Sequence, residues 1–233
     1  MKQLIIAEQV FTHYPSVELG VIILHNLDNT IPAVTNNLLQ ETMTTLRKNL
    51  TIETLPELPV IQQWRNVYQS FGATPPSTYR SSIEALLRRI LKGDLPNINF
   101  LVDLYNYASI KHLIPIGAED LDTIEGDIHL CPAEGNEQFF TIGSTENSPP
   151  KAKEIIYKDN KGTICRCWNW REGDRTKITP STKNAIIVIE NIIPNTKEKL
   201  FAVLQEITQL LQQHTKTIIT THMMNKNNRI ITI

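Results

Sequence analysis

The amino-acid sequence predicts an α+β fold, and two blocks of contrasting pattern carry that prediction. Between residues 31 and 109, apolar side chains recur mostly at helical spacing, whereas from residue 138 to residue 189 they form short runs typical of strands. The chain of 233 residues is 41% hydrophobic and 20% charged, which is the balance of an ordinary globular protein. We therefore expect helices packed on a mixed sheet.

The chain opens with two predicted strands and a helix. Leu4–Ala7 and Val17–His25 are apolar runs rich in β-branched residues, and Asp28-Asn29 ends the second run. From Ile31 to about Leu50, apolar residues follow helical spacing, and Pro32 falls in the first turn, where its missing N–H costs little.

Three further helices are predicted from periodicity and end signals. One runs from Ile61 to Gly72, a residue suited to a helix C-terminus. After a loop at Pro75-Pro76, Ser81 or Ser82 can cap a second helix that ends before Gly93. A third, shorter helix is expected over about 101–109.

Beyond this point the chain turns to strands, which we predict at residues 138–142, 154–158, 163–168 and 185–189. A last helix starts at Thr196, and a strand at 217–220 precedes a polar tail. Residues 144–153, rich in Ser, Pro and Lys, form the best candidate for a mobile loop. We expect one main domain, with residues 1–60 and 195–233 packed on a core of residues 61–194.

Charge and cysteine content restrict the class of protein. Lys and Arg total 23 against 24 Asp and Glu, so nucleic acid could be attracted only by a local basic patch. Three cysteines without a CxxC pair predict neither a disulfide framework nor a thiolate zinc site. No stretch approaches the length of a membrane span or a signal peptide, so we expect a cytoplasmic protein without membrane, metal or cofactor. No feature specifies the oligomeric state.

General catalytic motifs are absent from the sequence. It contains no GxSxG, HExxH, Walker phosphate loop or GxGxxG, so serine-hydrolase, zincin, NTPase and dinucleotide-binding functions lack support. The most informative segment instead places polar residues between apolar ones: Asp103 and Asn106 lie in residues 97–107, which are followed by Pro115-Ile116-Gly117-Ala118-Glu119. Buried side chains of this kind must bond to the backbone or to a ligand.

These residues resemble the editing domain, or B3/4 domain, of bacterial phenylalanyl-tRNA synthetase beta subunits. The shared pattern reads N-x-x-V-D-x-x-N-Y followed by P-x-H-A-F-D, and residues 165–172 and 178–184 are similar to the second half of that domain. The similarity to free-standing members of the family is closer, because Trp64-Arg65, residues 79–82, residues 86–89 and residues 166–171 look like their hallmarks. The resemblance covers about residues 61–194.

The resemblance implies a site that hydrolyses the ester of a wrongly attached amino acid, with an oriented water instead of a protein nucleophile. It implies that Glu172 positions water or the substrate ammonium, that Thr179 and Thr182 supply hydroxyl contacts, and that Arg171 stabilises an oxyanion or meets a phosphate. Further residues implied in substrate binding are Asp103, Asn106, Pro115, Gly117, Trp168 and Trp170. A surface of Arg65, Arg80, Arg88, Arg89 and Lys92 would bind RNA, and tRNA or aminoacyl-tRNA is the implied partner.

The sequence departs from the synthetase pattern at two positions. Gly117 replaces a histidine of the synthetase pattern, and Glu119 replaces an aromatic residue.

The same pocket could belong to a non-catalytic RNA-binding module, or to a protein that binds a free amino acid or similar metabolite. Exposed arginines would suit the enzyme and the RNA-binding module, whereas arginines held in ion pairs would favour the metabolite-binding protein or a structural role.

Overall fold

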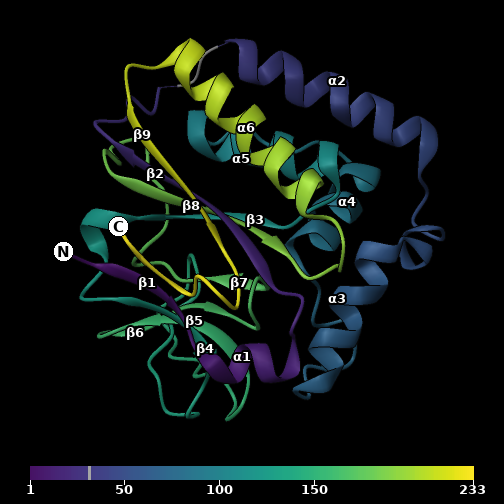
Figure 1. Cartoon of the computed structure of the whole chain (residues 1–233). Coiled ribbons are helices and arrows are strands. Elements are labelled where there is room, and N and C mark those ends of the chain that lie inside the picture. The colour runs from purple at the N-terminus through teal and green to yellow at the C-terminus, as the bar shows by residue number, and fades with distance from the viewer. Residues whose placement is uncertain (31–32) are drawn as a thin grey trace.

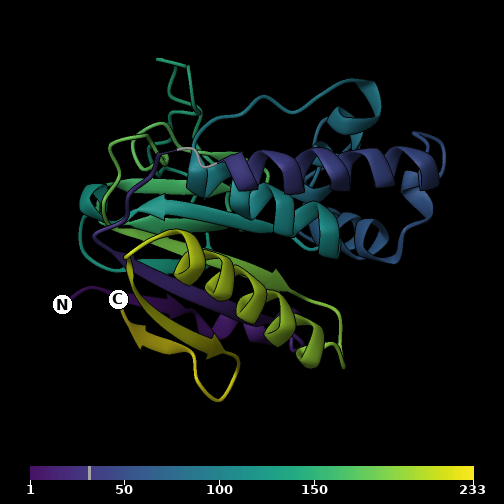
Figure 2. The ribbon, with the colours of Figure 1, turned by 90° about the horizontal axis from the view of Figure 1, so that it is seen from above.

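The computed structural model describes residues 1–30 and 33–233, which form three layers (Figure 1). Helices cover one face of a four-stranded sheet, and a six-stranded sheet lies against its other face. Seen from above, α2, α5 and α6 lie side by side over the four-stranded sheet (Figure 2). The predicted α+β class is confirmed.

The four-stranded sheet has the order β3-β8-β2-β9 and is antiparallel throughout. Its strands are β2 (Glu18–His25), β3 (Ile116–Asp120), β8 (Ala185–Asn191) and β9 (Ile218–Met224). The central strands β2 and β8 are buried along nearly their whole length, which explains their continuous apolar sequences.

The six-stranded sheet has the order β10-β1-β4-β5-β6-β7, with one parallel pair, β1 and β4. Its strands are β1 (Gln3–Ile6), β4 (Ile128–Pro132), β5 (Ile155–Asp159), β6 (Gly162–Arg166), β7 (Arg171–Glu172) and β10 (Ile230–Thr232). Because strands from both ends of the chain pair within it, we propose that the N- and C-terminal segments complete one domain with the central region.

The helices are α1 (Glu8–His13), α2 (Ala33–Asn49), α3 (Pro59–Ser70), α4 (Ser82–Lys92), α5 (Phe100–His112) and α6 (Lys197–His214). The predicted end signals are confirmed at two places: Ser81 Oγ accepts a hydrogen bond from Glu84 N at 3.4 Å, and Gly72 adopts a φ of 81° just beyond α3. The predicted first turn at Ile31 and Pro32 lies outside the described residues. No helix in the described part of the chain is long and apolar enough to cross a membrane.

Several elements differ from the sequence prediction. Residues 138–142 form no strand: Thr141 makes an isolated bridge with Gly173, and Ile142 N donates to Glu172 O of β7 at 3.2 Å. The strand predicted to reach Trp168 ends at Arg166, because Cys167 and Trp168 adopt left-handed backbone conformations. Trp168 and Trp170 therefore do not share one strand face. The sequence patterns did not predict α1, β3, β4, β7 or β10.

Candidate functional site

A narrow cavity lies between the two sheets, and the space open to the centre of a water molecule in it is about 40 Å³. One wall comes from β3 and β8, and the other from β1, β4, β5, β6 and β7, with Ser82, Trp168 and Asn169 completing the lining. The register explains the second wall, since Tyr157 pairs with Cys165 and Cys165 pairs with Glu172 across three neighbouring strands. Most of the lining is apolar, but three glutamates interrupt it: Glu119, Glu172 and Glu190.

Glu119 and Glu172 form a close pair at one end of the cavity. Their carboxyls lie within hydrogen-bonding reach of each other. Burial and the neighbouring Glu172 carboxyl raise the pKa of Glu119 well above its ordinary value, and burial also raises the pKa of Glu172. In each residue the buried oxygen Oε2 has no hydrogen-bond donor in the described structure.

Gly117 provides the space beside this pair. A Cβ atom at position 117 would lie 3.3 Å from Glu172 Oε1, which is closer than a side chain normally packs. The glycine lies within β3 and faces the carboxyl, so its role here is to leave room. The glycine thus allows the Glu172 carboxyl to lie close against β3.

Glu190 anchors a separate hydrogen-bond network at the Trp168 end. Tyr157 Oη donates to Glu190 Oε1 at 2.8 Å, and Asn169 Nδ2 donates to Glu190 Oε2. Asn169 Oδ1 in turn accepts from Tyr68 Oη at 2.7 Å. Burial raises the pKa of Glu190 from 4.5 to about 8 despite these donors, so the carboxyl is largely protonated at neutral pH.

The turn after β6 carries Trp168 and Asn169 to the cavity. Cys167 and Trp168 have φ values of 45° and 68°, a costly conformation for residues other than glycine. A buried ion pair beside the turn holds it, because Glu154 binds the Arg166 guanidinium at 2.9 and 3.0 Å and also accepts from Cys167 N at 2.9 Å. Trp168 is completely buried and packs edge-to-face on Trp64.

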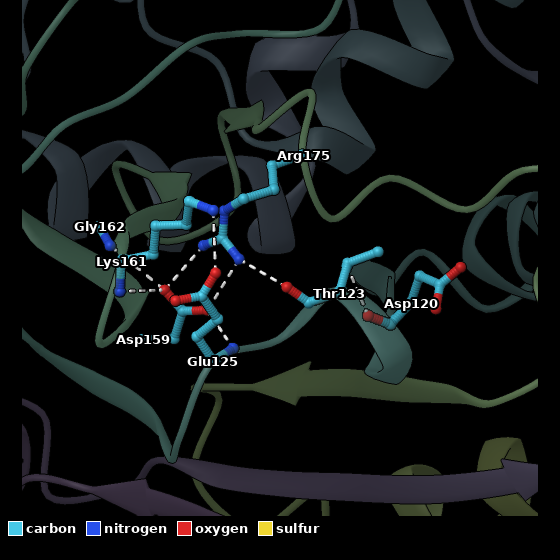
Figure 3. Close-up of polar contacts among 7 residues, drawn as sticks. All are labelled: Asp120, Thr123, Glu125, Asp159, Lys161, Gly162 and Arg175. Atoms are coloured by element: carbon cyan, nitrogen blue, oxygen red, sulfur yellow. Dashed lines mark hydrogen bonds and ion pairs between the residues drawn. The ribbon is translucent and has the colours of Figure 1, made fainter.

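A second ion pair supports the cavity from outside. Arg175 binds both oxygens of Asp159, at 2.7 and 2.9 Å, and donates to Thr123 O at 2.7 Å (Figure 3). The Asp159 carboxylate also accepts backbone N–H groups from Glu125, Lys161 and Gly162 (Figure 3). These bonds join the β5–β6 hairpin, the segment after β3 and the segment after β7, and so fix the two strands that carry Glu119 and Glu172.

A model of the B3/4 domain family matches residues 63–216. The chain belongs to the B3/4 domain family. Two similar relatives are phenylalanine–tRNA ligase beta subunits, from Fusobacterium nucleatum (28% identical over 120 residues) and Psychrobacter arcticus (31% identical over 98 residues). These alignments cover 52% and 42% of this chain but only 15% and 12% of the relatives.

One solved structure is also similar, an N-terminal fragment of the phenylalanyl-tRNA synthetase beta subunit from Pyrococcus horikoshii. It aligns with 96% of this chain and 54% of its own, at 13% identity and a TM-score of 0.46. Within this chain, every residue that lines the cavity falls inside the B3/4 match except Leu4.

The structure brings some of the predicted site residues together in this B3/4 cavity. Gly117, Trp168 and Glu172 line it. Arg171 precedes Glu172 but is exposed, and its guanidinium lies 5.1 Å from the centre of the Trp170 ring. Trp170 packs against Tyr79 outside the cavity.

The other predicted substrate-contacting residues lie elsewhere. Thr182 Oγ1 donates to Asp120 Oδ2 at 2.6 Å and accepts from Thr179 N, so both threonines belong to a turn outside the cavity lining. Asp103 is buried near the start of α5, where Oδ1 accepts from Ile98 N at 3.0 Å. Asn106 and Pro115 are also absent from the described lining.

The predicted RNA-binding residues divide into two groups. Arg65 and Arg88 both bind the buried Glu84 carboxylate, at 2.6 and 2.9 Å. Arg89 and Lys92 are exposed on the C-terminal part of α4, and Arg80 is half-buried with its Nε unpaired in the described structure. The five cations therefore do not form one uniformly free surface.

Sequence reasoning did not assign Glu119, Glu190 or Asn169 to the site. A signal existed for two of them: Glu119 lies two residues after Gly117 and so shares its strand face, and Glu190 ends an otherwise apolar run. A lone glutamate in a buried strand requires partners or a ligand.

The Glu190 pKa leads to a pH prediction. Because this carboxyl binds its proton more tightly when folded than when unfolded, its contribution to stability is full below about pH 4.5 and is lost as the pH rises through about 8. Glu190→Gln cannot titrate, so the decline in unfolding free energy over this interval should become shallower. Denaturant unfolding at several pH values checks this, with exposed Glu146→Gln as the control. Equal slopes in Glu190→Gln and the wild type would contradict the prediction.

Proposed function

We propose that this B3/4 protein acts in trans on mischarged aminoacyl-tRNA and hydrolyses the ester that joins the wrong amino acid to the tRNA. The observation that carries the proposal is a cavity, lined almost entirely by residues of the B3/4 match, in which Glu172 has a carboxylate oxygen without a hydrogen-bond partner in the described structure. The names of the relatives support tRNA as the proposed partner.

The chemistry follows from this arrangement. An aminoacyl ester is already activated, so hydrolysis needs a base to take a proton from water and a surface that orients the acyl carbon. Glu172 provides the base, and the apolar walls from β3, β8 and β5 enclose the amino-acid side chain. In this proposal Thr179 and Thr182 act indirectly, because they stabilise the turn that precedes β8.

Among the five residues predicted to bind RNA, Arg89 and Lys92 have exposed side chains. We propose that they contact tRNA phosphates. With few such contacts, tRNA affinity should be modest and should fall as salt rises. Arg65 and Arg88 organise α3 and α4 through Glu84 instead.

The test is deacylation of a panel of tRNAs charged with correct and incorrect amino acids, with Glu172→Gln as the blank for contaminating hydrolases. We expect release of at least one mismatched amino acid and much slower release of the correct one. Equal rates with wild type and Glu172→Gln, or no release from any tRNA, would reject the proposal.

The second candidate function is binding of a free amino acid or similar metabolite. It is favoured by the ion pairs of Arg65 and Arg88 with Glu84, which occupy two of the five cations needed for a phosphate-binding surface. Calorimetric binding of a free amino acid, together with no salt-sensitive tRNA binding, would favour this candidate over the editing enzyme and over a non-catalytic RNA-binding module.

A further inference from the structure

We propose that Glu119 is a second catalytic residue: it shares one proton with Glu172 and donates that proton to the leaving ribose oxygen of the ester. This inference rests on the proposed function and names a residue that the family pattern does not provide, since that pattern has an aromatic residue at this position. The pair would therefore distinguish this chain from the synthetase editing domain.

The geometry places the two carboxyls on opposing walls. Glu119 comes from β3 and shares a strand face with Gly117, whose Cβ position lies 3.3 Å from Glu172 Oε1. Glu172 comes from β7, opposite Cys165 of β6. Each carboxyl keeps one buried oxygen without a donor in the described structure. Two ionised carboxylates would leave both oxygens unsatisfied, whereas one proton between the carboxyls satisfies both.

The charges around the pair favour a single shared proton. No lysine, arginine or histidine is among the described residues that line the cavity. Arg175, whose charge lowers the pKa of Glu119, is bound to Asp159. Other groups that interact with the pair are neutral or acidic: the Cys165 thiol, the Thr176 hydroxyl, Tyr105 from α5 and Glu190 from β8. Close like charges in a low-dielectric site cannot both ionise, so the pair holds one proton over a wide pH range.

With one proton shared by the two carboxyls, every proton transfer in the hydrolysis has a donor and an acceptor. Glu172 carboxylate takes a proton from water while the water oxygen bonds to the acyl carbon, and a tetrahedral intermediate forms. The bond from that carbon to the ribose oxygen then breaks, and Glu119 transfers its proton to the departing oxygen. The free amino acid leaves with Glu172 protonated and Glu119 ionised, and passage of the proton between the two carboxyls restores the starting state. No other reactant is required.

The experiment combines deacylation kinetics with direct titration of the carboxyls. Single-turnover rates are measured against pH for the wild type, Glu119→Gln, Glu119→Asp and the control Glu146→Gln. We expect Glu119→Gln to lower the rate about 100-fold and to remove the alkaline limb of the pH profile, with partial rescue by aspartate. Glutamine keeps the size of the side chain and can still donate and accept hydrogen bonds, but it has no acidic proton to transfer, so a structural role alone would leave the profile unchanged.

The titration is independent of activity. In protein carrying ¹³C-labelled glutamate carboxyls, Glu119 and Glu172 should titrate as a coupled pair that vanishes in Glu119→Gln, and Glu190→Gln assigns the signal of the third glutamate that lines the cavity. Two independent titrations near the ordinary value would overturn the shared proton. A wild-type pH profile in Glu119→Gln would overturn the acid role. If wild type deacylates nothing, the editing proposal and the acid role fail together, and the titration still decides whether the pair exists.

Discussion

Glu172→Gln is expected to lower the rate of deacylation by about 100- to 10,000-fold, which is the usual contribution of a positioned general base. Glutamine fills the same space but cannot accept a proton from water. The substitution also removes one of two acidic groups that face each other in a cavity with no cation among its described lining residues. The folded state should be about as stable as wild type, because glutamine keeps the size of the side chain and its amide can donate a hydrogen bond to Glu119 in place of the shared proton.

Loss of activity without loss of stability is the result that separates a functional role from a structural one. The measurements are single-turnover deacylation and thermal unfolding of the same preparation, with Glu146→Gln as the control because its side chain is exposed. A Glu172→Gln protein that unfolds at a lower temperature and keeps its activity would contradict both parts of the expectation.

Local signals predicted many of the helices and strands because the physical reason for each lies in neighbouring residues. Ser81 caps α4 through its own hydroxyl, and Gly72 takes the positive φ that ends α3. The strands β2 and β8 are continuous apolar runs. By contrast, β3 has the sequence Ile-Gly-Ala-Glu-Asp, and only its pairing with β8 makes it a strand.

The cavity could be predicted only in part from the sequence. The resemblance pointed to Glu172, Gly117 and Trp168, which do line it. The pairing of Glu119 with Glu172 depends on two sheets facing each other, and no spacing in the sequence encodes that distance. Thr182 illustrates the reverse case, because its partner Asp120 lies 62 residues away and takes the hydroxyl for a turn.

The largest expected loss of stability comes from the buried ion pair that holds the Trp168 turn. Glu154→Ala should destabilise the protein by about 3–5 kcal/mol, because it leaves the Arg166 charge buried without its carboxylate. Cys167 N also loses its acceptor, so the left-handed turn loses a restraint on a strained conformation. Trp168 and Asn169 should then move. Glu154→Ala should therefore lose both deacylation activity and stability, whereas Glu172→Gln should lose activity alone.

The double variant Glu154→Ala with Arg166→Met isolates the cause. If the uncompensated charge dominates, removing both partners should recover a large part of the lost stability, since an apolar side chain can occupy the space of the guanidinium stem. Urea unfolding of the two single variants and the double variant measures the coupling between the residues. Equal destabilisation of Glu154→Ala and the double variant would show instead that the hydrogen bonds from the backbone to Glu154, rather than the buried charge, hold the turn against the cavity.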